Sequence, residues 1–283
     1  MRYLVTGGGG QLGRAFAKLY PEAVVLARSE LDITDREGVE AALERARPEV
    51  IVNAAAFTQV DAAEAQPDLA ALVNVEAVIR LAQAAKRAGA MLVQISTDYV
   101  FAGDKKGPYT ENDRTRPLSV YGRTKLQSEM AARAAGGKSL IIRTSWVYGE
   151  GKNFVASILD AAKRRDSLDV VDDQRGRPTN ALDLAGAIVT LLENGASGLV
   201  HVTGGGEAGT WADVAETVIE AAELPTQVRR VTTAQYYAGK SGPVATRPAN
   251  SELDCSLAAS VGVKLRPWEE AVTAYVRKKL ESD

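Results

Sequence analysis

The chain has 283 residues, with 34 lysines and arginines against 36 acidic residues and a formal net charge of −2 at pH 7. This length suits one large α/β domain, or a main domain with a smaller lobe. The nearly balanced, mixed charge indicates neither a nucleic-acid partner nor a membrane surface. Cys255 and His201 are each the sole residue of their type, which excludes an intrachain disulfide framework and cysteine-cluster or histidine-rich metal sites.

The N-terminal stretch MRYLVTGGGG is typical of neither a signal peptide nor a transit peptide. No apolar run reaches the roughly 18 residues that a spanning helix needs. We therefore expect a cytoplasmic protein. His201, in GLVHVTG, is interpreted as a packed strand residue, so the chemistry is expected from Tyr, Lys, Thr, Ser, carboxylates or a bound cofactor.

Short apolar runs alternate with longer alanine-rich helical patterns in the first half of the chain. We predict strands at 2–6, 23–27, 49–55, 91–96 and 139–145, and helices at 11–20, 35–46, 67–89 and 120–134. Continuous apolar strands separated by helices indicate a parallel sheet covered on both faces. The predicted fold class is therefore α/β, with a Rossmann-like doubly wound parallel sheet.

Beyond Trp146 the alternation is less regular. We predict helices at 153–165, 181–193, 211–222 and 267–282, and strands at 168–171 and 198–202. Residues 1–147 are predicted to form a dinucleotide-binding Rossmann domain. Residues 148–283 are predicted to form mainly a smaller C-terminal substrate-binding lobe, with some segments able to return to the main sheet.

A glycine loop follows the first predicted strand directly. Gly7, Gly10 and Gly13 form a GxxGxxG pattern at a strand-to-helix turn. Glycines there let backbone N–H groups and the positive helix end approach a pyrophosphate that side chains would obstruct. The position at the first strand–helix junction predicts a dinucleotide site, with Gln11 and Leu12 also in contact.

The second predicted strand ends at Arg28 and Ser29, where an NAD-selective site usually places an acid. These residues suit a 2′-phosphate, so NADPH is favoured over NADH, with NADH use left open. Asp32 and Ile33 are candidates to flank the adenine, although Asp32 could instead cap a turn. The small residues 54–56 (Ala54, Ala55 and Ala56) allow close approach to a flat ligand, or tight helix packing.

Tyr121 and Lys125 lie four positions apart on a predicted helix, a spacing that is common by chance and needs context. The fourth predicted strand runs into Thr97, Asp98 and Tyr99, at the carboxyl edge where open α/β folds bind ligands. A neighbouring ammonium favours a phenolate and lowers the pKa of a tyrosine. We predict that Tyr121 protonates a carbonyl oxygen and that Lys125 lowers its pKa.

Residues 4–13, 53–61, 96–103 and 121–125 together resemble the extended short-chain dehydrogenase/reductase superfamily, which carries TGxxGxxG and YxxxK. Over nearly the whole chain, further stretches are similar to the dTDP-4-dehydrorhamnose reductase family: VNAAAFTQVDAAE, STDYVFAG, VYGRTKLQSE, IIRTSWVYG, NFV, DDQRGRPT and RPANSELD. The resemblance implies NADPH-dependent reduction of the C4 ketone of dTDP-4-dehydro-L-rhamnose to dTDP-L-rhamnose. It also implies that the lysine holds the nicotinamide ribose and that a Ser or Thr orients the ketone.

The same resemblance implies a set of substrate contacts. Besides Thr97 and Tyr121, these are Thr58, Tyr99, Trp146, Asn153, Arg175 and Arg247. Trp146 would pack near the deoxysugar, or else belong to the core. The two arginines are candidates for the diphosphate, which a guanidinium can bind in bidentate fashion, and a structural salt bridge remains open for each.

Alternatives of two kinds remain. Sugar-nucleotide dehydratases of the superfamily carry an Asp-Glu pair after the Thr, whereas here Asp98 is followed by Tyr99, which favours simple ketone reduction. The chain could reduce another nucleotide-linked keto sugar, or it could be a non-catalytic dinucleotide-binding subunit resembling the regulatory subunit of methionine adenosyltransferase. No metal site is predicted, and metal dependence and a homodimer are left open.

Overall fold

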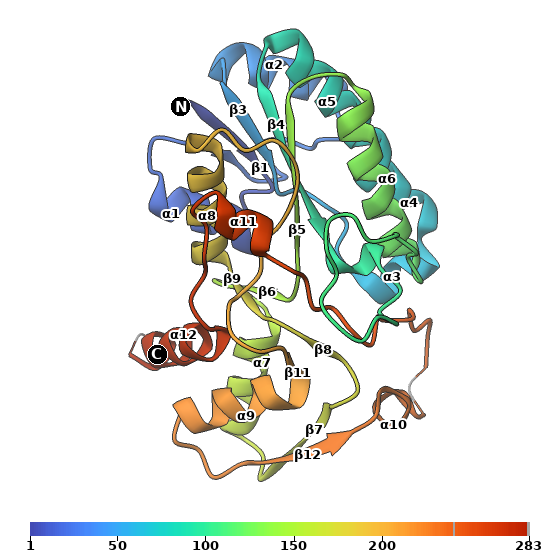
Figure 1. Cartoon of the computed structure of the whole chain (residues 1–283), viewed down its shortest axis with the longest axis vertical. Helices are drawn as coiled ribbons and strands as arrows, with labels where there is room; N and C mark the ends of the chain where they lie inside the picture. The colour runs from blue at the N-terminus through green and yellow to red at the C-terminus, as the bar shows by residue number, and fades with distance from the viewer. Residues whose placement is uncertain (240, 282–283) are drawn as a thin grey trace.

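A six-stranded parallel sheet organises the computed structural model, which describes residues 1–239 and 241–281 (Figure 1). Its strands are β1 (Tyr3–Thr6), β2 (Val24–Leu26), β3 (Val50–Asn53), β4 (Met91–Thr97), β5 (Ser139–Thr144) and β10 (Gly198–His201). They lie in the order β10-β5-β4-β3-β1-β2, and every neighbouring pair is parallel. The predicted doubly wound parallel sheet is confirmed.

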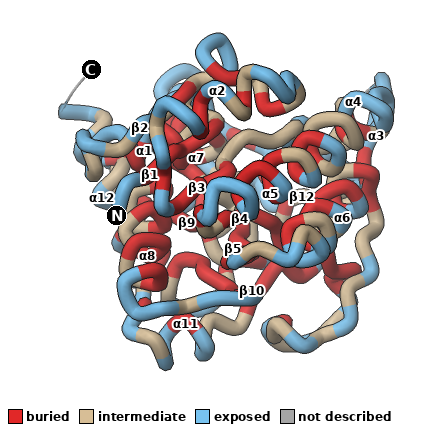
Figure 2. The backbone as a smooth tube through the Cα atoms, turned by 90° about the horizontal axis from the view of Figure 1, so that it is seen from above, coloured by how far each residue is buried: buried red, intermediate tan, exposed pale blue. Residues whose placement is uncertain are grey.

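Helices cover both faces of the sheet (Figure 1). One face carries α1 (Gln11–Leu19) and α8 (Ala181–Glu193), and the other carries α2 (Arg36–Ala46), α5 (Ala77–Ala88) and α6 (Val120–Ala134). Neighbouring residues of a strand point to opposite faces, so Val5 packs in the core beside α1 and α8, while Leu4 packs in the core beside α2 and α5. This double burial explains the continuous apolar strands, which Figure 2 shows enclosed between the helices.

The predicted helix 67–89 is interrupted. It consists of α4 (Pro67–Ala71), a π-helical turn (Leu72–Glu76) and α5. The buried side chain of Asn74, in that turn, accepts a hydrogen bond from Phe57 N and donates to Phe57 O and to Thr124 Oγ1. The wider turn thus ties this helix to the chain segment after β3 and to α6, both of which border the functional site.

The later residues form a second packed unit below the sheet in Figure 1. Its helices α7 (Phe154–Ala162), α9 (Trp211–Ala221) and α12 (Trp268–Leu280) share one apolar core with β7 (Ser167–Val171). β7 pairs in parallel with β12 (Gln227–Val231). The remaining elements are the 3₁₀ turn η2 (Asp98–Val100), α3 (Val60–Ala65), β6 (Val147–Tyr148), β8 (Arg175–Gly176), β9 (Thr179–Asn180), β11 (Gly209–Thr210), α10 (Thr233–Tyr237) and α11 (Ser256–Ser260).

Segments of the second half also complete the upper part. β10 pairs with β5, and α8 and α11 contribute Leu184 and Ala258 to the core on the α1 face. His201 in β10 is fully buried, its Nδ1 lies 3.1 Å from Tyr109 O, and burial together with Arg143 lowers its pKa to about 3. It is thus the packed strand histidine that the sequence predicts. The division of the chain at residue 147 stays a prediction.

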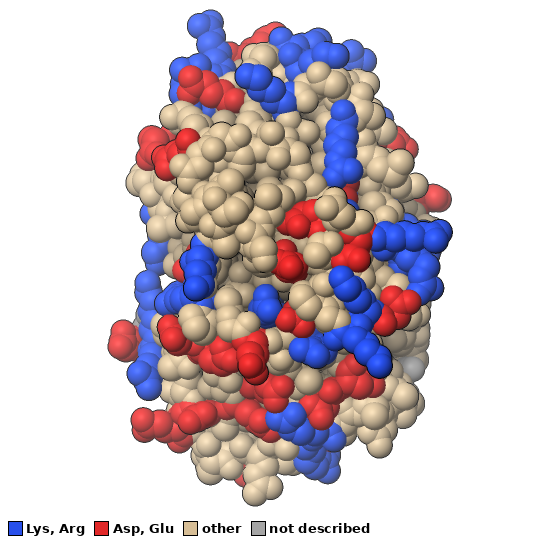
Figure 3. Space-filling model, viewed as in Figure 1, with Lys and Arg blue, Asp and Glu red and all other residues tan. Residues whose placement is uncertain are grey.

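Acidic and basic side chains are intermixed over the face drawn in Figure 3. Within residues 1–239 and 241–281, no helix has the length and apolar character needed to cross a membrane. The same residues contain no group of three or more His, Cys, Asp or Glu side chains placed to hold a metal ion.

Candidate active site

A cavity of about 750 Å³ opens at the carboxyl ends of β1, β3 and β4. The strand order turns back between β1 and β3, and ligands of open α/β sheets bind in the crevice at such a point. Leu184 from α8 and Trp211 from α9 line the cavity as well. The cavity therefore lies where the sheet meets the second packed unit.

The glycine loop forms one end of this cavity. Gly7 has a φ of +72°, and a Cβ there would stand 2.7 Å from the backbone carbon of Ala54, so neither the conformation nor the space suits another residue. Gly10 precedes α1 without any side-chain cap, and the first turn of α1 has no acidic residue. The backbone N–H groups at the positive, N-terminal end of α1 are thus available to an anion.

Most of the residues predicted for the cofactor line the cavity, namely Gly7, Gly10, Gln11, Leu12, Arg28, Asp32, Ile33, Ala54, Ala55, Ala56, Tyr121 and Lys125. Gly13 does not. A Cβ at Gly13 would lie 2.4 Å from Gly7 O, so this glycine serves the close packing of α1 against the loop and supports the site indirectly.

Arg28 stands at the rim of the cavity, with 75% of its side chain exposed. Its Nε donates to Asp32 Oδ2 at 3.1 Å. Asp32 also accepts hydrogen bonds from the backbone and hydroxyl of Thr34, which are the main cause of its lowered pKa. Asp32 therefore closes a turn, as its alternative interpretation proposed, and holds the guanidinium of Arg28 near the cavity.

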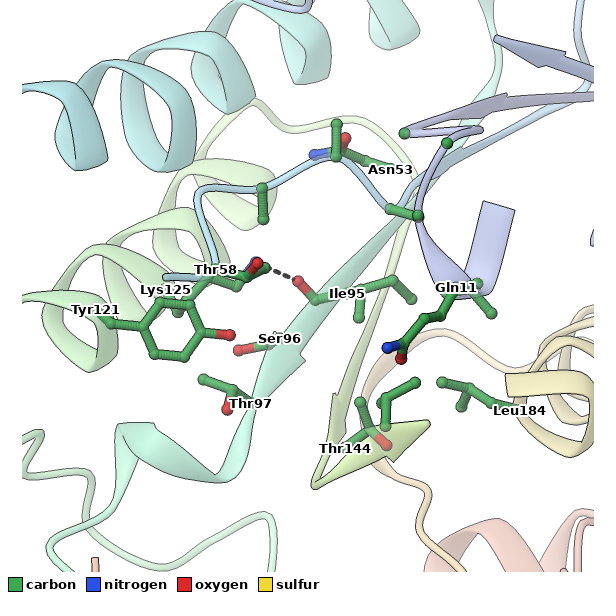
Figure 4. A pocket seen from close by; sticks show the side chains of 18 of the residues that line it. Gln11, Asn53, Thr58, Ile95, Ser96, Thr97, Tyr121, Lys125, Thr144 and Leu184 are labelled. Carbon is green, nitrogen blue, oxygen red and sulfur yellow. Dashed lines mark hydrogen bonds between the residues drawn. The ribbon is translucent and has the colours of Figure 1, made fainter. Parts of the chain in front are cut away.

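Helix α6 presents Tyr121 and Lys125 towards the end of β4 (Figure 4). Ser119 caps the start of the helix, since its Oγ accepts the N–H of Gly122 at 3.1 Å. A Cβ at Gly122 would come within 2.2 Å of Tyr99 O. Glycine at this position lets the first turn of α6 pack closely against η2, which brings Tyr121 next to Thr97.

The charges around Tyr121 differ from the prediction. Lys125 is buried, its Nζ donates to Ile95 O at 2.6 Å, and burial lowers its pKa to about 8, against the opposing effect of Glu129. Burial, together with the negative charge of Asp98, raises the pKa of Tyr121. The predicted lowering of the pKa of Tyr121 by Lys125 is therefore wrong in this structure, because loss of hydration dominates.

A hydroxyl and a carboxylate complete the reacting end. Thr97 Oγ1 donates to Asp98 Oδ1 at 2.9 Å, and Thr97 interacts with the hydroxyl of Tyr121 strongly enough to lower its pKa in part. Figure 4 shows the Tyr121 hydroxyl directed towards Ser96 and Thr97. Thr97, Tyr121 and Lys125 thus converge on the wall of one cavity. A protonated phenol beside a second hydroxyl can bind and protonate a carbonyl oxygen.

Aromatic rings border the cavity beyond these groups. Tyr99 contacts Tyr121 edge to face, with ring centroids 5.4 Å apart. Trp146 stacks on Trp211 with centroids 3.7 Å apart and 16° between the ring planes. Trp146 has a φ of +50°, an uncommon conformation for a large residue. With Thr58, the aromatic residues Tyr99, Trp146 and Trp211 line the cavity.

Three predicted substrate residues lie elsewhere. Asn153 caps α7 by accepting the N–H of Ala156, and its Nδ2 donates to Gly149 O at 2.6 Å. Arg175 pairs with Glu252 at 3.2 Å and Arg247 pairs with Asp61 at 2.7 Å. None of these three residues is among those that line the cavity, although Arg247 acts on Tyr99, which does line it.

Among the lining residues that the sequence did not mark as functional, Trp211 was not predicted at all, and Asp98 was placed at the carboxyl edge of the sheet without a role. Trp211 opens a helix 65 positions after Trp146 (211 − 146), and no local pattern links the two. Asp98 had a visible signal, because it follows Thr97 at a strand end, yet its burial depends on α6 and on Ser251 from the distant segment near residue 250.

Comparison with known proteins agrees with this architecture. A family model described as the RmlD substrate binding domain matches residues 1–281. A dTDP-4-dehydrorhamnose reductase of Sinorhizobium fredii is 40% identical, over 98% of this chain and 97% of that protein. A dTDP-4-keto-6-deoxy-D-glucose reductase of Streptomyces niveus is 39% identical, over 96% of this chain and 95% of that protein.

Among solved structures, the dTDP-4-dehydrorhamnose reductase of Bacillus anthracis in complex with NADP superposes with a TM-score of 0.91 and 33% identity, over 98% of this chain and 99% of the other. The match of the family model covers all of the described residues. The chain therefore belongs to the family of the RmlD substrate binding domain, the dTDP-4-dehydrorhamnose reductase family that its sequence motifs indicate.

Proposed function

We propose that this protein is an NADPH-dependent reductase that converts the C4 ketone of dTDP-4-dehydro-L-rhamnose into the hydroxyl of dTDP-L-rhamnose. The observation that carries the proposal is the meeting of Thr97, Tyr121 and Lys125 with the glycine loop around one cavity. Relatives that are about 40% identical over nearly their full length are named for this activity.

The cavity fits a nicotinamide dinucleotide. The cradle at Gly7, the uncapped start of α1 and the small residues 54–56 leave backbone amides and space for a pyrophosphate and flat rings. Arg28 is free enough to face a 2′-phosphate, and a relative binds NADP. NADPH is therefore the proposed coenzyme, and when bound it supplies the hydride.

The residues of this chain supply the remaining steps. Tyr121 is protonated at neutral pH like any tyrosine, and its raised pKa keeps it so, so it holds a proton for the oxygen that becomes the C4 hydroxyl. Thr97 lies beside it and binds the same oxygen. Lys125, with a pKa of about 8, is mostly charged at neutral pH, and its role here is to hold the nicotinamide ribose, as the family resemblance implies.

The test is a comparison of coenzyme oxidation with two enzymatically made substrates, dTDP-4-dehydro-L-rhamnose and dTDP-4-keto-6-deoxy-D-glucose. We expect kcat/KM to be highest for the first substrate with NADPH. Equal or higher kcat/KM for the second substrate would overturn the assignment of the sugar. NADPH binding without turnover of either sugar would overturn the reductase and favour the regulatory-subunit alternative.

A second candidate function has one specific support. A relative named for reduction of dTDP-4-keto-6-deoxy-D-glucose is nearly as similar to this chain as those named for dTDP-4-dehydrorhamnose. Both sugars carry a ketone at C4, so Thr97 and Tyr121 would act alike on either. The difference between the two activities would lie in the aromatic wall of Trp146 and Trp211.

A further inference from the structure

Asp98 is a buried carboxylate at the cavity wall that the proposed reaction leaves without a role. Only 2% of the residue is exposed, and its Oδ1 accepts the hydroxyl proton of Thr97 at 2.9 Å. Oδ2 is also buried. Ser251 lies near enough to lower the pKa of Asp98, but its geometry gives Oδ2 no hydrogen bond within the described chain. Keeping such a group ionised is unfavourable.

The charge of Asp98 decides what Thr97 can offer to a substrate. A threonine hydroxyl has a single proton. While this proton goes to an ionised Asp98, Thr97 presents only lone pairs to the cavity and cannot hold a ketone oxygen, which is itself an acceptor. A protonated Asp98 can donate to Thr97 Oγ1, and the proton of Thr97 is then free to point at the ketone.

The same charge acts on Tyr121. Asp98 is a cause of the raised pKa of Tyr121, second only to burial. Its negative charge therefore opposes the phenolate that forms when Tyr121 gives up its proton. A neutral Asp98 removes this opposition, so both effects favour reaction in the protonated form.

We propose that Asp98 is a positioning residue that works in its protonated form, turning the hydroxyl of Thr97 towards the ketone oxygen of the substrate. The inference rests on the proposed reductase function and assigns Asp98 a role that a merely structural carboxylate would not have. It acts through Thr97 and does not itself touch the reacting atoms.

The surroundings of Asp98 agree with this role. The titratable and polar groups that face it are Thr97 from β4, Tyr99 from η2, Tyr121 from α6 and Ser251. Arg247 acts on Tyr99 and pairs with Asp61. No cation is among the causes that shift Asp98, and burial raises its pKa to about 6 against the opposing effects of Ser251, Thr97 and the backbone N–H groups of Asp98 and Tyr99. A ligand that fills the cavity excludes more water and raises it further.

The charge of Asp98 sets how kcat depends on pH. Asp98 is protonated below its folded pKa, so the active orientation of Thr97 is populated there and is lost as the pH rises through that value. Above it, wild-type kcat should fall about tenfold per pH unit, as for loss of one essential proton. The fall should begin near pH 6 or higher, according to how far the bound ligands exclude water.

The experiment compares kcat between pH 5 and pH 9 for wild type, Asp98→Asn and Asp98→Ala. The asparagine amide donates to Thr97 at every pH, so Asp98→Asn should lose the fall that belongs to Asp98 and keep the low-pH wild-type rate up to about pH 8, where Lys125 begins to lose its proton. Asp98→Ala leaves the Thr97 hydroxyl without orientation and should be slower throughout, by up to the roughly 10²-fold to 10³-fold that loss of one oriented donor costs. Asp160→Asn, a change at an exposed position of α7, should leave the wild-type profile intact.

The inference would be overturned if Asp98→Asn kept the wild-type falling limb, or if it were as slow as Asp98→Ala while folded by circular dichroism. Should Asp98→Ala fail to fold, Asp98→Asn alone still decides the question. Failure of the proposed function looks different, because wild type itself would then show no turnover at any pH.

Discussion

The two ends of the cavity differ in the groups that form them: backbone and small residues at one end, larger side chains at the other. The end near β1 and β3 consists of glycines, alanines and free helix amides, in segments that follow one another closely in the sequence. The reacting and substrate end consists of side chains from β4, α6, the turn after β5 and α9, brought together by tertiary packing. Backbone cradles follow from local patterns, whereas side-chain sites depend on the whole fold.

The largest expected effect separates these two ends. Tyr121→Phe removes the proton donor and leaves the glycine loop untouched, so kcat should fall by about 10²-fold to 10⁴-fold, with the Kd for NADPH unchanged. Steady-state kinetics and fluorescence titration measure the two quantities. Tyr20→Phe, at the end of α1 and outside the cavity lining, is the matched control. A wild-type kcat in Tyr121→Phe would refute the role of this tyrosine.

A glycine at the reacting end tests how far packing places the tyrosine. Gly122→Ala puts a Cβ within 2.2 Å of Tyr99 O, so overpacking should lower the free energy of unfolding by about 1–3 kcal/mol and shift Tyr121. A Cβ at Gly186 in α8 would have no neighbouring atom within 4 Å, so Gly186→Ala should raise the free energy of unfolding by about 0.5–1 kcal/mol. Urea denaturation distinguishes them. Equal effects of the two changes would contradict the close approach of α6 and η2.

Lys125 is expected to support turnover at a cost to the stability of the fold. Its folded pKa is lowered from 10.5 to about 8, so below pH 8 its burial as an ammonium opposes folding, and this penalty disappears as the pH rises from 8 to 10.5. Lys125→Met should abolish turnover yet raise the free energy of unfolding by about 1–3 kcal/mol at pH 7. The gain should vanish near pH 10.5. If Lys125→Met were still more stable than wild type at pH 10.5, burial of the Lys125 ammonium would not be the cause of the gain.

The smallest expected effect lies at the coenzyme end. Arg28→Ala should raise the KM for NADPH by about 5-fold, corresponding to about 1 kcal/mol for an exposed charged contact, and leave the KM for NADH unchanged. The control is Arg36→Ala. Arg36 follows the lining residue Ile33 by three positions but does not itself line the cavity. Equal changes in the KM for NADPH and the KM for NADH would show that Arg28 does not recognise the 2′-phosphate.

The sequence predicts the sheet and the coenzyme end because both depend on short-range patterns. Buried strands read as apolar runs, and Gly7 is required by a φ of +72° and by contact with Ala54. Thr97, Tyr121 and Lys125 could be predicted as well, since one strand end and one helix turn carry them. Their mutual electrostatics could not, because the pKa of Tyr121 depends on burial that no local pattern reveals.

The substrate end was predicted less well for the same reason. Asn153, Arg175 and Arg247 were inferred from family resemblance, but in the structure their side chains serve a helix cap and two salt bridges. Trp211 was missed because its contact with Trp146 joins segments that are far apart in the sequence. Such contacts become visible only once α9 is packed beneath the sheet.

The most direct test of the reductase uses NADPH that carries deuterium at the transferable position of nicotinamide C4, with dTDP-4-dehydro-L-rhamnose as substrate and NMR of the product. We expect dTDP-L-rhamnose with deuterium at C4 of the sugar and one NADPH oxidised for each product formed. A product without deuterium at C4, or no product from a protein that binds NADPH, would contradict it.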